Sequence, residues 1–444
     1  MFRRTAAYTS QPYGVPVSER IEVQTPRPDL PRALGDGERA IDALLAESHL
    51  LAAHELPALV ARHAATLGAE EALLYLADLQ QEVLVPFLGS AGAAVDQTLV
   101  PLAVDGTLAG RAYQLVEVIT QEVPDAGVRL WLPLLDGSDR LGVLTVRVAS
   151  EAALQADDQL LLTRLRRLAS LVSELVMTKT MYGDALVRLR RRGEMGLAAE
   201  MQWSLLPPLT FACREVTVAA ALEPAYQVAG DTVDYAVDEG CARVAVFDGM
   251  GHGLQSAQLA ALAVSAYRNA RRSDKSLTDT ALLIDAALLL VFGGEAFTTA
   301  VIAQLDTGTG RLDWINAGHP EPLLLRDGRL VKSLHADPAP PLGLGESDGT
   351  PATFSVGSEQ LEPGDRVLFY TDGVTEARSP EGDFFGVEQL ADLVTRNLAS
   401  GLPTPETMRR VVRALLTHQQ GQLSDDATML LLEWRSGNER SLLF

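Results

Sequence analysis

Four sites in the C-terminal half of the chain place aspartate beside an apolar run. Asp231 follows Gly230 in VAGDTVDY, Asp248 ends VAVFD, Asp372 follows VLFYT, and Asp425 stands just before ATMLLLEW. Aspartate is common in turns, so any one of these positions has an ordinary structural interpretation. Together, carboxylates gathered at one edge of a sheet would repel each other unless they were protonated or bridged by cations. Mg²⁺ and Mn²⁺ favour such oxygen ligands, so the pattern indicates a metal site.

The stretch RVAVFDGMGHG (243–253) sharpens this hypothesis. A phosphate-binding P-loop needs a Lys after its last Gly, and a Rossmann loop needs G-x-G-x-x-G, whereas these glycines follow G-x-G-x-G. A metal site fits better, because Asp248 could bridge two ions and the carbonyl of Gly249 can approach closely without a side chain in the way. His252 could orient phosphate or assist a proton transfer, or it could only stabilise the turn.

The remaining reactive side chains have ordinary interpretations. The two cysteines, Cys213 and Cys241, provide neither a disulfide framework nor a zinc cluster, and they fit a reducing cytoplasm. We expect Cys241 to pack rather than react, and His319 in NAGHP to shape a turn. The net charge of −21 argues against nucleic acid or an anionic membrane as the main partner. No apolar run has the length of a membrane span, and no signal peptide is expected.

One domain over residues 209–436 must position the aspartates. Strand-like runs such as CARVAVFD and DRVLFYTDG alternate with two predicted helices at 254–269 and 277–292. Turns such as DTGTGR and RDGR join several of the strands as hairpins. This pattern predicts a β-sandwich with helices covering its faces, and an α+β fold class overall.

A second domain is predicted over residues 37–177. The runs VRLWLPLLD and LGVLTVRVAS around GSDR indicate a β-hairpin, within an antiparallel sheet flanked by helices. Residues 1–36 are rich in Pro, Ser, Thr and Arg without apolar periodicity, which predicts a disordered arm. Residues 437–444 are expected to be a frayed tail.

A long helix, either continuous or interrupted, is expected over residues 156–206 between the domains, with residues 178–208 as the helical linker. Two glycines in GEMG loosen it, and Pro207–Pro208 end it. Apolar residues recur at alternating steps of four and three, the spacing of a coiled-coil seam: Leu161, Leu165, Leu168, Val172 and Leu175, continued by Lys179, Tyr182, Leu186 and Leu189. The helix either packs on its own domain or forms a parallel homodimer, and we expect the homodimer.

A combination of motifs in the C-terminal domain carries a family resemblance. In order they are AYQVAGDTVDYAV, VAVFDGMGHGLQSAQLA, FTTAVIAQLD, LDWINAGHPEPLLLRDG, PPLGLG, LEPGDRVLFYTDGVTEAR and SDDATMLLLEW. They resemble the SpoIIE-type serine/threonine phosphatases, the bacterial branch of the PPM (protein phosphatase 2C) superfamily. The resemblance implies an α/β/β/α sandwich with a centre of two Mn²⁺ or Mg²⁺ ions at one edge.

The resemblance also implies roles for individual residues. Asp248 would bridge both ions, the Gly249 carbonyl would hold one, and Asp372 and Asp425 would ligate the other. Asp231 would ligate one ion directly or through water. Of the pair at 425 and 426, the first aspartate matches the family's ligand. A water held between the ions would attack phosphorus in line.

The N-terminal domain has a second resemblance. TLAGRAYQLVEVI followed by LPLLDGSDRLGVLTV resembles a GAF sensor domain, with a PAS-like or purely structural domain as alternatives. No Cys lies in residues 1–180, which excludes covalent bilin attachment through Cys there. We expect His49, His54 and His63 to be satisfied or solvated helix residues rather than haem ligands. The sequence does not identify a GAF ligand.

The two resemblances together imply a cytoplasmic, metal-dependent protein serine/threonine phosphatase regulated by its GAF-like domain. Its substrates would be phosphorylated anti-sigma-factor antagonists of the STAS type. Two alternatives stay open: a dimeric sensor or scaffold protein with weak catalysis, and a metal-dependent hydrolase of small phosphate esters.

Overall fold

The computed structural model of the chain describes residues 36–89, 99–155, 160–223, 226, 229–345, 352–421, 423, 425–437, 440 and 442. The arm predicted over residues 1–36 lies outside this set, apart from Asp36, which begins the first helix. Most of the tail predicted over residues 437–444 also lies outside it. Leu442 is described and is only 1% exposed. The frayed tail over residues 437–444 stays a prediction.

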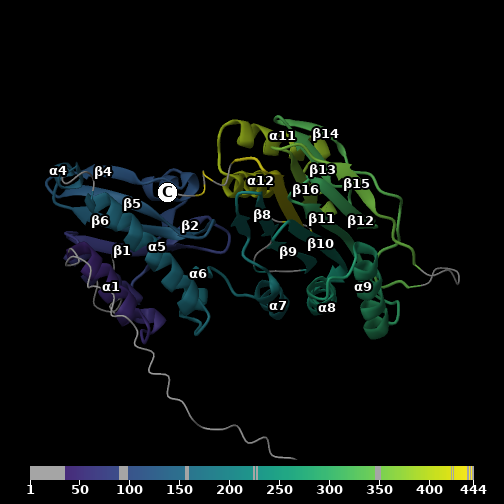
Figure 1. Cartoon of the computed structure of the whole chain (residues 1–444), viewed down its shortest axis with the longest axis horizontal. Coiled ribbons are helices and arrows are strands. Elements are labelled where there is room, and N and C mark those ends of the chain that lie inside the picture. Colours follow the sequence, from purple (N-terminus) through teal and green to yellow (C-terminus); the bar gives the residue numbers. More distant parts are fainter. Residues whose placement is uncertain are drawn as a thin grey trace, which may run out of the picture.

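The N-terminal unit is built on a six-stranded antiparallel sheet in the order β3-β2-β1-β6-β5-β4 (Figure 1). Its strands are β1 (Glu71–Ala77), β2 (Val83–Phe87), β3 (Leu102–Ala103), β4 (Ile119–Val123), β5 (Gly127–Asp136) and β6 (Asp139–Val148). The predicted hairpin is confirmed, since β5 pairs with β6 along its length, from Val128↔Val148 to Asp136↔Asp139.

Helices cover both faces of this sheet. The helices α1 (Asp36–Ser48), α2 (Leu56–Thr66) and α5 (Leu160–Thr180) pack on one face, and α3 (Leu108–Leu115) packs on the other. Successive strand residues point to opposite faces: Leu130 and Leu132 of β5 meet the first group of helices, and Trp131 meets α3. Two short helices, η1 (Ala53–Glu55) and α4 (Glu151–Gln155), complete the unit. Its likeness to a GAF domain stays a prediction.

The segment between the two units is helical with two interruptions. It consists of α5, α6 (Ala185–Arg190) and α7 (Leu197–Leu205), with breaks at residues 181–184 and 191–196. The second break contains the two glycines of GEMG, and α7 ends just before Pro207–Pro208, as the sequence predicts.

The interpretation of the linker's apolar seam as a dimer contact was wrong. Leu165, Leu168, Val172 and Leu175 are buried in the core of the N-terminal unit, where α5 lies on the sheet. Leu186 belongs to the same core, although it lies on α6 rather than on a continuation of α5. The spacing of four and three therefore reflects packing of the helix on its own sheet. The apolar seam no longer supports a homodimer through this helix.

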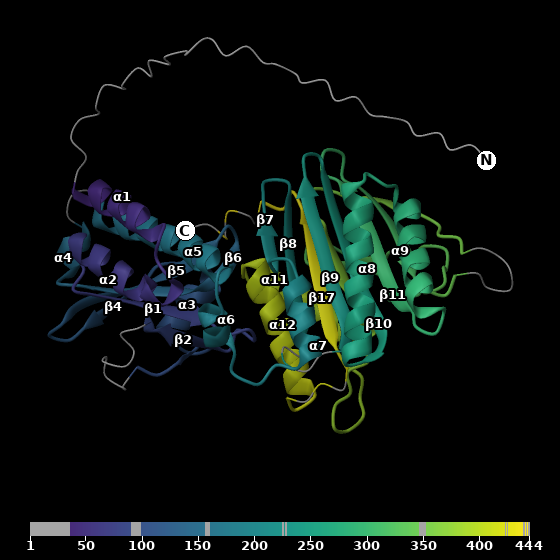
Figure 2. The same cartoon turned by 90° about the horizontal axis from the view of Figure 1, so that it is seen from below.

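The C-terminal unit has two stacked antiparallel sheets (Figure 2). The first has the order β15-β12-β11-β10-β9 and contains β9 (Ala229–Asp238), β10 (Cys241–His252), β11 (Thr298–Asp306), β12 (Arg311–Ala317) and β15 (Gly357–Gln360). The second has the order β14-β13-β16-β17-β8-β7 and contains β7 (Thr210–Ala212), β8 (Val216–Glu223), β13 (Leu323–Arg326), β14 (Arg329–Ser333), β16 (Arg366–Tyr370) and β17 (Ala427–Trp434).

Helices cover the outer face of each sheet. The predicted helices α8 (Leu254–Arg272) and α9 (Leu277–Phe292) lie on the first sheet, and α11 (Gly386–Ala399) and α12 (Thr404–His418) lie on the second. Alternation along β10 explains the layers. Val244 and Val246 point into the core between the sheets, whereas Ala245 and Phe247 point outward to α8 and α9. The unit is an α/β/β/α sandwich, as predicted.

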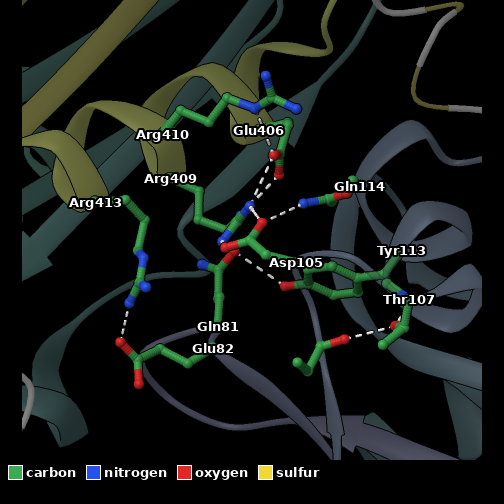
Figure 3. A network of polar contacts seen from close by, with 12 residues as sticks. Gln81, Glu82, Asp105, Thr107, Tyr113, Gln114, Glu406, Arg409, Arg410 and Arg413 are labelled. Carbon is green, nitrogen blue, oxygen red and sulfur yellow. Dashed lines mark hydrogen bonds and ion pairs between the residues drawn. The ribbon is translucent and has the colours of Figure 1, made fainter.

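A cluster of ion pairs with a buried centre joins the two units (Figure 3). Arg140 of β6 donates to Glu406 of α12 over 3.0 Å, and Arg409 donates to the same carboxylate over 2.9 Å. Arg409 also binds Asp105 of the N-terminal unit at 2.6 Å. The side chains of Arg140, Glu406 and Arg409 are at most 4% exposed. We call Asp105, Arg140, Glu406 and Arg409 the interdomain cluster.

In the part of the chain that the structure describes, no helix is both long enough and apolar enough to cross a bilayer.

Candidate metal centre

Two predicted site residues face each other on neighbouring strands of the first sheet. Asp231 of β9 is the direct partner of Asp248 of β10. Beyond this pair the register shifts before His252 pairs with Ala229, so β10 bulges through its glycines. Gly251 adopts φ 86°, a left-handed conformation that glycine adopts at low cost. The bulge ends the regular ladder just beyond the two carboxylates.

The second sheet contributes the other aspartates from two adjacent strands. Asp372 begins the short helix α10 (Asp372–Thr375) directly after β16, and Asp425 and Asp426 immediately precede β17, which pairs with β16. A Cβ at Gly373 would lie 1.8 Å from the carbonyl oxygen of Asp426. Only glycine at this position lets the start of α10 lie so close to the turn that carries the aspartate pair.

A second glycine brings the strands of the first sheet together at the site. A Cβ at Gly230 would lie 2.1 Å from the carbonyl oxygen of Gly249. The Gly249 carbonyl therefore faces the backbone of β9 beside Asp231. Its role as a metal ligand stays a prediction.

Hydrogen bonds connect the aspartates of the two sheets. The Thr371 hydroxyl donates to Oδ2 of Asp231 over 2.7 Å and accepts from the Thr428 amide over 3.0 Å. The Asp231 amide donates to Oδ2 of Asp426 over 3.4 Å. Because Thr371 is fully buried, this contact fixes one oxygen of Asp231. Sequence reasoning missed Thr371, although a polar residue between an apolar strand and an aspartate was a usable signal.

The electrostatics of the site show carboxylates that repel one another. Burial raises the pKa of Asp231 well above its ordinary value, and the charges of Asp248 and Asp426 raise it further. Burial, together with the charges of Asp372 and Asp425, raises the pKa of Asp248 to about 6. The pKa of Asp372 is also raised, first by burial and then by Asp425. Positive charge placed among these groups would relieve the repulsion.

The donor set has the chemistry of a site for hard divalent cations. It offers several carboxylates from two sheets and a nearby backbone carbonyl, the ligand types that Mg²⁺ and Mn²⁺ favour. No three His, Cys, Asp or Glu side chains among the described residues converge closely enough to hold an ion as they stand. The residues thus fit divalent ions by type and charge, and binding would require their side chains to draw together.

The structure brings Asp231, Asp248, Asp372 and Asp425 into one electrostatically coupled group, as the sequence predicts. It adds Asp426, which is buried and faces Asp231, whereas Asp425 is exposed. The sequence motif favoured only the first of this pair, because motif spacing does not show which carboxylate turns inward.

The predicted histidines have different environments. His252 is exposed at the end of β10, and its imidazole makes no hydrogen bond to any residue that the structure describes. A role for its side chain in stabilising the turn therefore has no support. His319 shapes a turn as predicted, since its amide donates to Asn316 and its carbonyl accepts from the same side chain, each over 2.8 Å. Burial lowers the pKa of His319 to about 3, which keeps the ring neutral.

Helix α7 of the linker reaches the site from outside the sandwich. The Gln202 side chain is buried and donates to the backbone carbonyl of Asp231. Arg268 of α8 binds the last residue of α7 through the Leu205 carbonyl at 2.5 Å and also pairs with buried Asp234 at 2.7 Å. The linker is therefore in direct contact with the strand that carries Asp231.

Comparison with known proteins places this site in a family. Residues 238–435 match the family described as Stage II sporulation protein E (SpoIIE). This segment is a SpoIIE-family domain. Asp248, Asp372 and Asp425 lie inside the matched SpoIIE segment, whereas Asp231 lies just before it.

Three relatives are similar to parts of this chain. Protein IcfG of Synechocystis sp. is 33% identical over 135 residues, which cover 30% of this chain and 20% of IcfG. Phosphoserine phosphatase RsbP of Bacillus subtilis is 27% identical over 195 residues, covering 43% of this chain and 47% of RsbP. Phosphoserine phosphatase RsbU of the same organism is 26% identical over 245 residues, covering 54% and 70%. The chain spans less than half the length of the first two relatives.

The raised pKa values of the SpoIIE domain predict how stability depends on pH without divalent cations. The ordinary pKa of an Asp side chain is about 3.9, whereas the pKa of folded Asp248 is about 6. Between these values the folded state binds more protons than the unfolded state, so stability is expected to fall as the pH rises from about 4 to about 6. Urea unfolding in a chelator across this range should show the fall, and the Asp248→Asn variant should show less of it. Equal slopes for both proteins would contradict the prediction.

Removing the Thr371 hydroxyl is expected to weaken the site without unfolding the protein. In Thr371→Val the side-chain shape is kept, but Asp231 loses its donor and the Thr428 amide loses its acceptor. Loss of such a supporting contact commonly lowers metal affinity or activity about 10–100-fold. Calorimetric titration with Mn²⁺ measures the change, and Thr417→Val, at an exposed position of α12, provides the control. Unchanged Mn²⁺ affinity in Thr371→Val would show that this contact does not support the site.

Proposed function

We propose that the chain is a metal-dependent protein serine/threonine phosphatase. The observation that carries this proposal is the meeting of four aspartates from two sheets, coupled by charge, in and beside a SpoIIE-family domain. Two relatives of the domain are named phosphoserine phosphatases, which supports the same reaction class.

The residues of the site have distinct roles in this proposal. Asp231, Asp248, Asp372 and Asp425, with the Gly249 carbonyl, would hold two Mn²⁺ or Mg²⁺ ions. When bound, such ions supply an activated water and neutralise the phosphoryl oxygens. Thr371 keeps Asp231 oriented toward the site, and Asp426 lies behind Asp231 as a buried neighbour. His252, exposed and without a partner among the described residues, would contact the phosphate or protonate the leaving oxygen.

We further propose that the substrate is a phosphoserine or phosphothreonine in a regulatory protein, an anti-sigma-factor antagonist of the STAS type. The similarity to RsbU and RsbP supports this choice. Regulation through the N-terminal GAF-like unit is part of the proposal, and the contact of Gln202 with Asp231 supports it. A cytoplasmic location is supported by two cysteines that are both free.

Phosphate release from three substrates tests the proposal. The full chain is incubated with a phosphorylated STAS-domain protein, with free phosphoserine, and with p-nitrophenyl phosphate, in Mn²⁺, Mg²⁺ or chelator. A protein phosphatase should release phosphate fastest from the phosphoprotein and only with metal. Faster turnover of the small esters would favour a small-molecule phosphohydrolase. Metal-dependent binding of the phosphoprotein with negligible turnover would favour a scaffold.

A further inference from the structure

The helix-covered side of the N-terminal unit contains a cavity that the phosphatase site does not use. Its volume is about 870 Å³, within the range of small-molecule sites. It lies where α1 leads into η1 and where α5 leads into α6, so four helices provide its walls. The sheet face covered by α3 lies on the other side of the unit.

A buried lysine lines this cavity. Lys179, in the last turn of α5, is 8% exposed, and its ammonium forms no ion pair or hydrogen bond with any described residue. The buried part of Lys179 is its aliphatic stem, and the ammonium is still reached by solvent, as is usual for a lysine whose stem packs on an apolar surface. This unpaired ammonium is therefore accessible to a negatively charged group inside the cavity.

The other walls indicate what kind of molecule supplies that charge. Leu45, Leu51, Leu171 and Leu175 give the cavity an apolar surface beside Lys179. Such a surface suits an apolar body of several carbons, because removing apolar area from water stabilises the complex.

Charged residues at the rim of the cavity restrict which charged head group a ligand can have. The exposed lining residues include three basic side chains, Arg188, His49 and His54. They also include two acids, Glu174 and Asp184. The acids would repel a dianion such as a phosphate ester, whereas the one unpaired ammonium of Lys179 balances a single negative charge. A carboxylate fits this arrangement better than a phosphate.

We propose that this cavity binds a small organic carboxylate, with its head on the Lys179 ammonium and its apolar body along the leucines of α1 and α5. The ligand would contact α5 and α6 at the same time, because residues of both helices line the cavity. It would thus occupy the junction where the N-terminal unit passes into the linker. The proposal does not depend on the phosphatase activity.

Calorimetric titration of the full chain with octanoate tests the site, with octan-1-ol as the uncharged comparison. Octanoate should bind the wild-type protein, and Lys179→Met should weaken this binding about tenfold or more, as expected for loss of a charge-assisted contact. Lys275→Met, at an exposed loop lysine, is the matched control and should bind as wild type does. Octan-1-ol should bind wild type and Lys179→Met alike.

A second variant keeps the test decisive if Lys179→Met does not fold. Ala52→Trp places a large side chain at an exposed wall of the cavity and should block octanoate while the protein stays folded. Equal octanoate affinity in wild type and Lys179→Met, or no binding to wild type at millimolar concentration, would overturn the proposal. Because binding is measured directly, these outcomes are independent of whether the chain releases phosphate.

Discussion

Replacing Asp248 with Asn is expected to lower metal-dependent phosphate release at least about 100-fold. Changes to partners outside the ligand shell commonly cost 10–100-fold, so the loss of a proposed ligand should cost no less. Asp372→Asn should have an effect of similar size, because Asp372 faces the same group from the other sheet. Initial rates on a phosphoprotein across a range of Mn²⁺ concentrations measure both variants.

Stability should change in the opposite direction in the same variant. The pKa of Asp248 is raised, so its charge is unfavourable in the metal-free fold at neutral pH. Asp248→Asn should therefore unfold at a higher temperature than wild type in chelator, yet gain less from added Mn²⁺. Asp238→Asn, at the far and exposed end of β9, is the control for both measurements. Wild-type turnover in both Asp248→Asn and Asp372→Asn would rule out this metal centre.

Replacing Glu406 with Gln is expected to destabilise the protein by about 3–5 kcal/mol, the usual cost of removing one partner from a buried ion pair. Arg140 and Arg409 would then stay buried without the carboxylate that both contact. Figure 3 shows the contact made by Arg409. The effect should appear as a lower unfolding midpoint in urea. It should also appear as faster proteolysis at residues 191–196, because the units would separate at that break in the linker.

Two further variants show whether charge or packing causes the change. Asp392→Asn removes an exposed i,i+4 pair with Arg396 and should cost no more than about 0.5 kcal/mol. Replacing Arg140 and Arg409 with Met and Glu406 with Leu removes the buried charges together and should restore most of the stability. If Glu406→Gln unfolds at the wild-type urea concentration, the interdomain cluster does not hold the units together.

The candidate site could be predicted because its chemistry is local in sequence. Each aspartate stands beside an apolar strand, and strands that stack in a sandwich bring their ends together. The inward orientation of Asp426 and the donation by Thr371 could not be predicted, because both depend on the contact between β9 and the turn before β17. Asp231 is 195 positions from Asp426 and 140 positions from Thr371 in the sequence.

The linker shows why periodicity alone misleads. A seam at steps of four and three describes one apolar face of a helix, and the same face can meet a partner chain or the helix's own sheet. Leu168 and Val172 lie on their own sheet, and α5 ends at Thr180. The ion pairs between the units could not be predicted from the sequence either, because Arg140 and Glu406 are 266 residues apart and neither belongs to a recognisable motif.

Helix α7 and the residues after it also cover the free edge of the first sheet. β9 ends that sheet, so one side of this ten-residue edge strand has no neighbouring strand in the sheet. Exposed edges of this length invite pairing with another molecule. The Gln202 side chain donates a hydrogen bond to the Asp231 carbonyl, and the Tyr235 hydroxyl donates to the Pro208 carbonyl. These contacts hold the linker against the edge strand. A shortened chain that began after Pro208 would present an open strand to its own copies, and it would tend to self-associate at the strand that carries Asp231.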